Sequence, residues 1–298
     1  MKQKLKGALI LLTGTVIWGS AFVAQSVGMA YIGPFTFQAV RCALAVLLLI
    51  PLSFFFEEAP FRSDAFLEKW LNPRLWKAGA VCGLALFVAG GLQQVGLVYT
   101  TPGKAGFITA MYIVLVPILG LFLGRKPPAV VWVSVALAAF GLYLLSGAGS
   151  SGINYGDLCV LGSAFAFAVQ ITLVDRHAAS LDGIRLNCIQ SLVCSVLSAV
   201  LMFAAETPSA GAILSCWLPL CYAGFLSMGV AYSFQIIGQK YIEPAAASLI
   251  MSLESVFSVL FAWILLKQTM TPGELLGCCL VFGAVLLTQL PSKRNRHD

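Results

Sequence analysis

The chain has 298 residues, of which 59% are hydrophobic and only 10% are charged, and its mean hydropathy is +0.92. Soluble domains have about 45–50% apolar and about 25% charged residues, so 18 basic and 12 acidic side chains are too few to cover a soluble protein of this length. This balance excludes soluble enzymes, nucleic-acid-binding proteins and small disulfide-stabilised folds. The composition predicts an all-α polytopic membrane protein.

Apolar segments long enough to cross a bilayer, about 20 residues each, follow one another along the chain. We expect ten spans, at 7–29, 34–56, 78–99, 104–124, 129–147, 157–175, 185–205, 213–238, 244–266 and 273–290. The basic N-terminus resembles a signal peptide, but the apolar run behind it is longer than a usual signal core, so we expect a retained first span. The longest connection, 57–77, carries four acidic and four basic residues and is either an amphipathic surface helix or a solvated loop.

The distribution of lysine and arginine predicts the orientation. If the N-terminus is cytoplasmic, 15 of the 18 basic residues fall in cytoplasmic segments, only Lys104 and Lys267 fall outside, and Arg41 lies within the second span. Basic residues are retained on the cytoplasmic side. We therefore expect a multi-pass protein of the cell membrane with both termini cytoplasmic, a cytoplasmic loop at 57–77 and a cytoplasmic tail at 291–298. The net charge of +6 follows from this asymmetry, so the expected surroundings are the lipid bilayer and no nucleic acid.

The two halves of the chain resemble each other. A shift of 142 residues over 84–123 aligns 11 identical residues in 40 positions, among them Gln93 with Gln235, where roughly four are expected by chance. A shift of 149 relates the first two spans to the sixth and seventh. We expect two five-helix repeats, 1–147 and 156–290, and the second is inverted in the membrane because five is an odd number.

Inverted repeats are typical of transporters that expose a mid-membrane site to either side in turn. The sequence therefore favours a secondary active transporter of a small molecule. Duplication can also build a non-transporting membrane scaffold or assembly subunit, and this alternative stays open. A channel is disfavoured because no ring of charged residues or apolar gate is visible.

Two ionisable residues lie well inside the predicted spans. Arg41 lies roughly 10 Å into the second span, and Glu254 lies near the middle of the ninth. An ionisable side chain at the bilayer centre costs about 2.5–3.5 kcal/mol on insertion scales, so such residues usually face a cavity. The alternatives are that Arg41 extends to the outer headgroups, and that Glu254 pairs with Arg41 or bonds to a neighbouring helix.

Amide, hydroxyl and aromatic residues accompany this pair in spans one to four and six to nine, whereas spans five and ten are nearly free of polar groups. We expect a central cavity lined by the eight polar spans. Spans five and ten are then peripheral, where they can support a homodimer. The candidate residues for substrate binding or coupling are Arg41, Glu254, Trp18, Gln38, Gln93, Tyr112, Gln170, Asn187, Gln190, Tyr232, Gln235 and Ser252.

Glu254 is the candidate for coupling transport to an ion gradient. A carboxyl at mid-membrane can exchange a proton or bind a substrate ammonium group. Its repeat partner under the 142 shift is Tyr112, so the acidic group breaks the symmetry of the repeat. Such a difference is expected at a functional position, and the candidate coupling ion is the proton.

Motifs for enzyme chemistry are missing from the sequence. His177 and His297 lie outside the predicted spans, and none of the nine cysteines belongs to a C-x-x-C pair. The cysteines fit the role of small buried apolar residues. We expect no catalytic residue, no metal and no cofactor.

Several short motifs occur in a fixed order in the two halves. The first half carries Trp18-Gly19-Ser20, Arg41 with Leu44, and a run from Tyr99-Thr100-Thr101-Pro102-Gly103-Lys104 to Leu115-Val116-Pro117. The second half carries Tyr241-Ile242-Glu243-Pro244, Leu253-Glu254-Ser255-Val256-Phe257 and Ala262-Trp263-Ile264-Leu265-Leu266. In order, spacing and duplication these motifs resemble the drug/metabolite transporter superfamily, specifically its EamA-type members, over essentially the whole chain.

The resemblance implies ten helices with cytoplasmic termini and two inverted repeats around a central cavity. It also implies secondary transport of small metabolites, amino acids or drug-like solutes, often outward. Two positions depart from the family pattern. Ser255 stands where the family usually has proline, and Lys267-Gln268 stands where it usually has Gly-Glu. The first departure predicts a straighter ninth span.

Overall fold

The computed structural model describes residues 2–56, 68–145, 154–267 and 271–289. Every regular element within these ranges is a helix, as the composition predicts. The helices are α1 (Lys2–Gly28), α2 (Pro34–Phe55), α4 (Pro73–Leu97), α5 (Pro102–Thr109), α6 (Tyr112–Phe122), α7 (Ala129–Leu145), α8 (Tyr155–Ala178), α9 (Gly183–Ala205), α10 (Ala210–Ser215), α11 (Trp217–Cys221), the π-helix η1 (Tyr222–Ala231), α12 (Tyr232–Gln239), α13 (Pro244–Met251), α14 (Leu253–Leu266) and α15 (Pro272–Gln289).

Helix length and hydropathy agree with a membrane protein. Eight stretches within the described ranges are long and apolar enough to cross a bilayer, and they coincide with eight of the predicted spans. The predicted spans 129–147 and 273–290 coincide with two shorter apolar helices, Ala129–Leu144 and Leu275–Thr288. At 1.5 Å per residue these two reach only about 20–25 Å, compared with about 30 Å for the hydrocarbon core.

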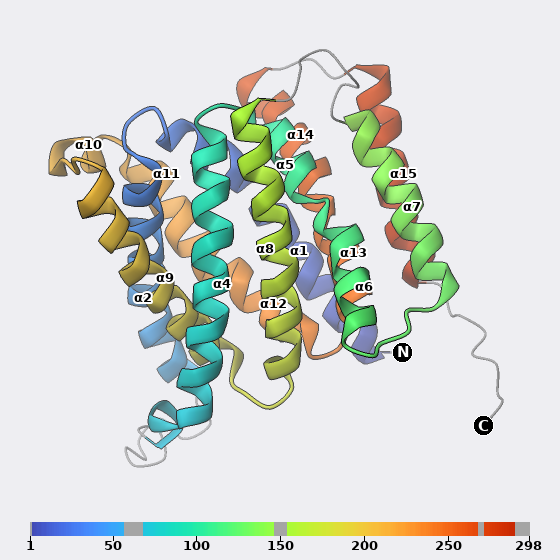
Figure 1. Cartoon of the computed structure of the whole chain (residues 1–298), viewed down its shortest axis with the longest axis horizontal. Coiled ribbons are helices and arrows are strands. Elements are labelled where there is room, and N and C mark those ends of the chain that lie inside the picture. Colours follow the sequence, from blue (N-terminus) through green and yellow to red (C-terminus); the bar gives the residue numbers. More distant parts are fainter. Residues whose placement is uncertain (1, 57–67, 146–153, 268–270, 290–298) are drawn as a thin grey trace.

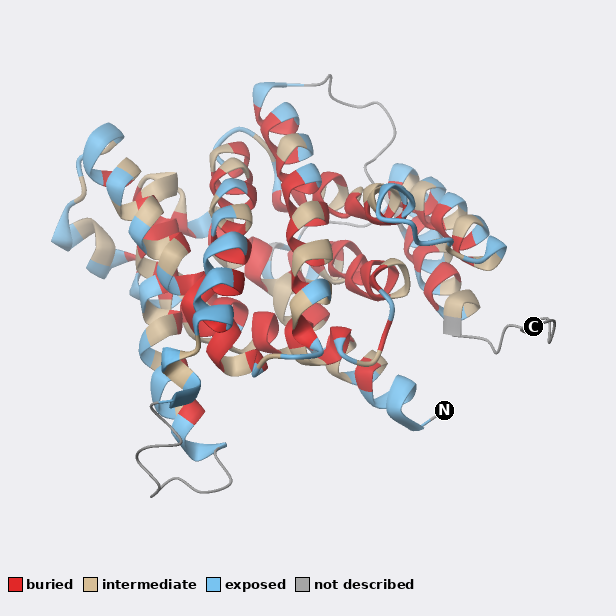
Figure 2. Ribbon diagram, turned by 60° about the horizontal axis from the view of Figure 1, so that its bottom comes forward, coloured by how far each residue is buried: buried red, intermediate tan, exposed pale blue. Residues whose placement is uncertain are grey.

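The outer surface of the bundle is apolar. Phe55 and Phe122 are each 84% exposed and Phe203 is 74% exposed, whereas buried residues are concentrated between the helices (Figure 2). Large exposed aromatic side chains are unfavourable in water but fit a surface covered by lipid tails. The chain is therefore a multi-pass helical membrane protein.

Proline and short polar side chains begin many of these helices. Proline occupies the first turn of α2, α4, α5 and α13, where its missing N–H has no helical partner in any case. Asn72, Thr101 and Asp182 each accept a hydrogen bond from a first-turn N–H, and Asn154 forms a capping box with Asp157. Polar residues between the apolar runs therefore fix where the helices start.

Three predicted spans are not continuous α-helices. The fourth is divided into α5 and α6, the ninth is divided into α13 and α14 at Ser252, and the eighth contains the ten-residue π-helix η1. The ninth span is thus interrupted even though Ser255 stands where the family usually has proline, and a straighter ninth span stays a prediction. The hydroxyls of Ser248, Ser252 and Ser255 each donate to a carbonyl three residues earlier. Such bonds compete with the helical ladder and bend a helix without proline.

The main helix contacts have counterparts in which each helix is replaced by the equivalent helix of the other half of the chain. Helix α4 packs against α8 and α9, while η1 packs against the corresponding helices α1 and α2. The α5–α6 stretch packs on α8, as the α13–α14 stretch packs on α1. Helices α2 and α9 pack against each other, as do α7 and α15. Exchanging the first five spans for the last five therefore leaves this contact pattern unchanged.

Successive spans run in opposite directions through the bundle (Figure 1). Helices α1, α4, α7, α9 and α13 begin at its lower end in that view, and α5, α8 and α15 begin at its upper end. Helices α7 and α15 form a pair at one edge, apart from the centre, as the sequence predicts.

Part of the predicted 57–77 connection can be described. Residues 68–71 are helical, and α4 begins at Pro73, five residues before the predicted start of the third span. Residues 57–67 and the predicted tail 291–298 lie outside the described residues. A surface helix over the whole connection therefore stays a prediction.

Candidate functional site

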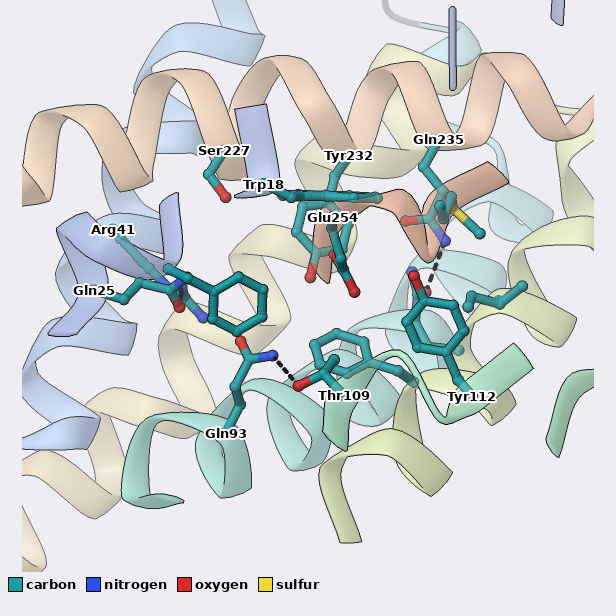
Figure 3. Close-up of a pocket in the computed structure, with 15 residues that line it drawn as sticks. Trp18, Gln25, Arg41, Gln93, Thr109, Tyr112, Ser227, Tyr232, Gln235 and Glu254 are labelled. Carbon is teal, nitrogen blue, oxygen red and sulfur yellow. Dashed lines mark hydrogen bonds between the residues drawn. The ribbon is translucent and has the colours of Figure 1, made fainter. Parts of the chain in front are cut away.

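A cavity lies at the centre of the bundle, between α1, α2, α4, α8, the broken stretches α5–α6 and α13–α14, and the η1–α12 stretch (Figure 3). Its volume is about 40 Å³, which holds about three water molecules at roughly 10–15 Å³ each. The lining residues are Trp18, Phe22, Gln25, Arg41, Gln93, Thr109, Tyr112, Phe167, Gln170, Ile171, Ser227, Tyr232, Gln235, Met251 and Glu254.

Within the described ranges, Arg41 is the only lysine or arginine that lines this cavity. Its side chain is 3% exposed, and its guanidinium donates to Gln25 Oε1 and to Gln38 Oε1, each at 2.5 Å. It also lies 5.8 Å from the Phe37 ring centroid. A side chain that extended to the headgroups would leave its guanidinium exposed. Arg41 therefore faces the cavity, and its side chain does not extend to the headgroups.

Glu254 places a carboxyl in the same cavity. It is 6% exposed, and its Oε1 accepts no hydrogen bond from the residues that the structure describes. It lies in the first turn of α14, where the helix dipole favours negative charge. No ion pair joins Glu254 to Arg41, because no guanidinium nitrogen lies within 4.0 Å of the carboxylate. The alternative of a structural pairing between the two residues is therefore not observed.

Aromatic rings form much of the remaining wall. The rings of Trp18 and Tyr232 meet edge to face with centroids 5.0 Å apart. Tyr112, Phe22 and Phe167 add further rings. A wall of this kind packs against apolar parts of a ligand and can contact a cation through the ring faces.

Amide side chains connect the cavity to η1. Gln235 donates to Gln170 at 3.0 Å, Gln170 donates to Gln190 at 3.3 Å, and Gln190 donates to Asn187 at 2.9 Å. Asn187 Nδ2 in turn donates to the carbonyls of Met228 and Gly229, both at 2.9 Å. Gln235 and Gln170 line the cavity, whereas Gln190 links Gln170 to Asn187, and Asn187 bonds to the backbone of η1.

Two other candidate residues also support the cavity from behind. Gln38 holds the guanidinium of Arg41, and it fits only because Gly90 has no side chain, since a Cβ there would lie 2.3 Å from Gln38 Nε2. Ser252 is fully buried at the break between α13 and α14, where its hydroxyl donates to the carbonyl of Leu249. Gln38, Asn187, Gln190 and Ser252 are therefore not among the residues that line the cavity, and a role for them in binding or coupling stays a prediction.

The remaining eight candidates, from Trp18 to Glu254, are brought together around the cavity. Gln93, for example, donates to Thr109 Oγ1 across the cavity wall at 3.1 Å (Figure 3). The apolar lining residues could not be selected from the sequence, because similar residues occur throughout the spans. These residues are Phe22, Phe167, Ile171 and Met251.

Four buried polar atoms of cavity residues have no hydrogen-bond partner within the described chain. Two are donors, Trp18 Nε1 and Arg41 Nε, and two are acceptors, Gln235 Oε1 and Glu254 Oε1. Buried polar groups are nearly always hydrogen-bonded in folded proteins. The four atoms therefore indicate room for a bound polar molecule that both donates and accepts.

Metal binding has no support in the described part of the chain. No cluster of three or more His, Cys, Asp or Glu residues lies there within reach of one ion.

Two ion pairs join the ends of α8 to Lys104 in α5 and to Arg125 just after α6. Lys104 Nζ lies 2.7 Å from Asp157 Oδ2 at one end, and Arg125 lies 2.5 Å from Asp175 Oδ2 at the other. Asp157 also accepts hydrogen bonds from Thr100 Oγ1. These contacts fix α8 and the α5–α6 stretch on one side of the cavity.

Comparison with known proteins identifies the family. The sequence profile of the EamA-like transporter family matches residues 5–147 and, a second time, residues 154–290. The chain belongs to the EamA-like transporter family. It is therefore a member of the drug/metabolite transporter superfamily, as its motifs indicate.

Relatives of this EamA-family protein are named as transporters. An uncharacterized transporter of Archaeoglobus fulgidus is 33% identical over 97% of this chain and 87% of its own length. The threonine/homoserine exporter RhtA of Escherichia coli is 27% identical over 95% of this chain and 90% of its own length. A solved crystal structure has the same fold, with a TM-score of 0.79 at 19% identity over 98% of this chain and 99% of the other.

Proposed function

We propose that this EamA-family protein is a secondary active transporter that carries small zwitterionic metabolites, with amino acids the favoured class, out across the cell membrane. The observation that carries the proposal is the cavity itself, in which a buried guanidinium and a buried carboxyl share one aromatic-lined space. A zwitterion offers a carboxylate to Arg41 and an ammonium group to Glu254. Both charged residues would then be paired without adding net charge to the membrane interior.

Alternating access is the proposed mechanism. The family profile matches the chain twice, and the helix contacts are unchanged when the two halves are exchanged. These features support ten spans arranged as two inverted repeats, and the distribution of lysine and arginine supports cytoplasmic termini. A cavity of about 40 Å³ is too small to admit a metabolite, so loading requires the surrounding helices to move. The breaks in spans four, eight and nine are the proposed points of bending.

The direction and coupling of transport belong to the same proposal. Outward transport is supported by the relatives named as threonine/homoserine exporters. Glu254 is the proposed coupling residue, because among the described residues it is the one carboxyl lining the cavity and its Oε1 is unpaired. Gain or loss of a proton there would change the balance between conformations that open to opposite sides.

Transport in proteoliposomes tests the proposal. Vesicles loaded with unlabelled L-threonine or L-homoserine and diluted into the labelled amino acid should show saturable uptake driven by counterflow. A scaffold gives no uptake above empty vesicles for any solute of an amino-acid panel, and a channel gives uptake that neither saturates nor responds to the internal solute. Either result would overturn the proposal.

A binding screen extends the test to other solutes. A ligand present at 100 times its dissociation constant stabilises the folded protein by about 2.7 kcal/mol. We expect zwitterionic compounds to raise the unfolding temperature more than anionic or cationic compounds of the same size. Selective stabilisation by a purely cationic drug would assign a different substrate class.

A further inference from the structure

Two cysteine side chains meet between α2 and α9, behind Arg41. The Sγ atoms of Cys42 and Cys194 lie 3.4 Å apart, and the thiol of Cys42 donates to Cys194. Both residues are fully buried. The sulfur atoms of a disulfide are about 2.0 Å apart, so an approach of about 1.4 Å would join them.

The surroundings hold the two sulfur atoms in place. Gln38 Nε2 donates to Cys194 Sγ at 3.3 Å, and the same Gln38 accepts a hydrogen bond from Arg41. One residue further along α9, the hydroxyl of Ser195 donates to the carbonyl of Ala39 on α2 at 2.9 Å. The two helices are thus linked beside the thiols, and Cys194 Sγ receives two hydrogen bonds. Hydrogen-bond donors stabilise negative charge on a sulfur atom, and the charged form is the reactive one.

We propose that Cys42 and Cys194 form a redox-sensitive pair that hydroperoxides convert into a disulfide between α2 and α9. In the first step Cys194 sulfur attacks the peroxide O–O bond, which gives a sulfenic acid and one molecule of water from hydrogen peroxide. In the second step Cys42 sulfur attacks the sulfenic sulfur and releases the hydroxyl as a second water. Two thiols and one hydrogen peroxide thus give one disulfide and two waters.

The position of the pair makes the modification relevant to the cavity. Arg41 lines the cavity, Gln38 bonds to Arg41, and Cys194 bonds to Gln38. A disulfide between Cys42 and Cys194 would therefore lie two side chains behind the cavity. The bond would join the second and seventh spans covalently beside the buried guanidinium. The inference does not depend on which solute is transported.

Thiol counting on the parent protein tests the inference. The purified full-length chain in detergent is treated with hydrogen peroxide, denatured, alkylated with N-ethylmaleimide and weighed by intact mass spectrometry. The chain has nine cysteines, so we expect the number of alkylated thiols to fall by two, with full recovery after a reducing agent. Non-reduced peptide mapping should find Cys42 linked to Cys194.

Two variants sharpen the result. Cys42→Ser removes the resolving thiol, so peroxide should leave a sulfenic acid at Cys194 that dimedone traps. Cys188→Ser is the matched control, because Cys188 is a buried cysteine of the same helix and its loss should leave the linked peptide unchanged. The proposal is overturned if the parent keeps all its thiols, or if the lost thiols map to the more exposed Cys221 and Cys279. Mapping of the parent decides the question even if a variant fails to fold.

Discussion

The guanidinium of Arg41 forms a fork that two amides already hold, and its Nε remains unpaired. Lysine has a single ammonium group and cannot reproduce this planar set of donors. Arg41→Lys should weaken binding of a zwitterionic ligand about tenfold or more, since a hydrogen bond to a charged group contributes about 1.5–3 kcal/mol. A thermal-shift titration with the ligand from the screen measures the change.

Arg185 provides the matched control for that substitution. It is also 3% exposed, but it lies near Asp182 and the Trp70 ring and does not line the cavity. Arg185→Lys should leave the dissociation constant unchanged. An equal loss of ligand affinity in the two variants would show that Arg41→Lys lowers the stability of the protein in general and removes no contact with the ligand.

Glu254 combines burial with an unpaired oxygen, which is the residue-level basis for the coupling hypothesis. Glu254→Gln keeps the shape and the carbonyl acceptor but removes titration. We expect gradient-driven accumulation in proteoliposomes to be lost, while exchange of solute across the membrane partly survives. Accumulation equal to that of the parent between about pH 5.5 and pH 8 would make the carboxyl structural. Glu206→Gln is the control, because that carboxyl caps α2 at the N–H groups of Phe35 and Thr36, outside the cavity.

At the scale of elements, one buried amide side chain, that of Asn187, contacts the backbone of the π-helix in the eighth span. Asn187 donates to two carbonyls of η1 and to Ser233 Oγ. Asn187→Leu has a similar size but removes the donor to the Met228 carbonyl, while the Gly229 carbonyl keeps only its hydrogen bond from Ser233 Oγ. We expect the free energy of unfolding to fall by about 1–3 kcal/mol. Ser191→Ala, which removes only a 3.4 Å contact to Asn187, is the control. Equal unfolding temperatures for Asn187→Leu and the parent would refute this role.

At the scale of the whole molecule, the proposed topology places successive connections on opposite sides of the membrane. In a cysteine-free background, Ser209→Cys should react with a membrane-impermeant maleimide added outside intact cells. Lys126→Cys should react only after the cells are permeabilised. Both positions are exposed, so burial does not limit either reaction. Reversed labelling would reject the orientation and with it the proposed cytoplasmic termini.

The sequence alone determined the membrane class and the start of many helices, because these depend on local properties. Apolar runs of bilayer length cannot be exposed to water, and proline or a capping side chain begins a helix wherever the fold places it. Arg41 and Glu254 were also predictable, since an ionisable side chain among apolar residues must turn inward. Repetition of the pattern further predicted two related halves, which the double match of the family profile supports.

Only the tertiary structure decided which polar residues line the cavity and which support it. Four amide residues look alike in the sequence. Gln170 and Gln235 line the cavity, whereas Asn187 and Gln190 lie behind it and bond to neighbouring residues. Successive side chains point in directions about 100° apart around a helix. Which of them face the cavity depends on how the helix is rotated about its axis, and packing against neighbouring helices sets that rotation. The break at Ser252 and the π-helix η1 change that rotation within a span. The surroundings of Cys42 and Cys194, 152 residues apart in the chain, were decided in the same way by the packing of α2 on α9.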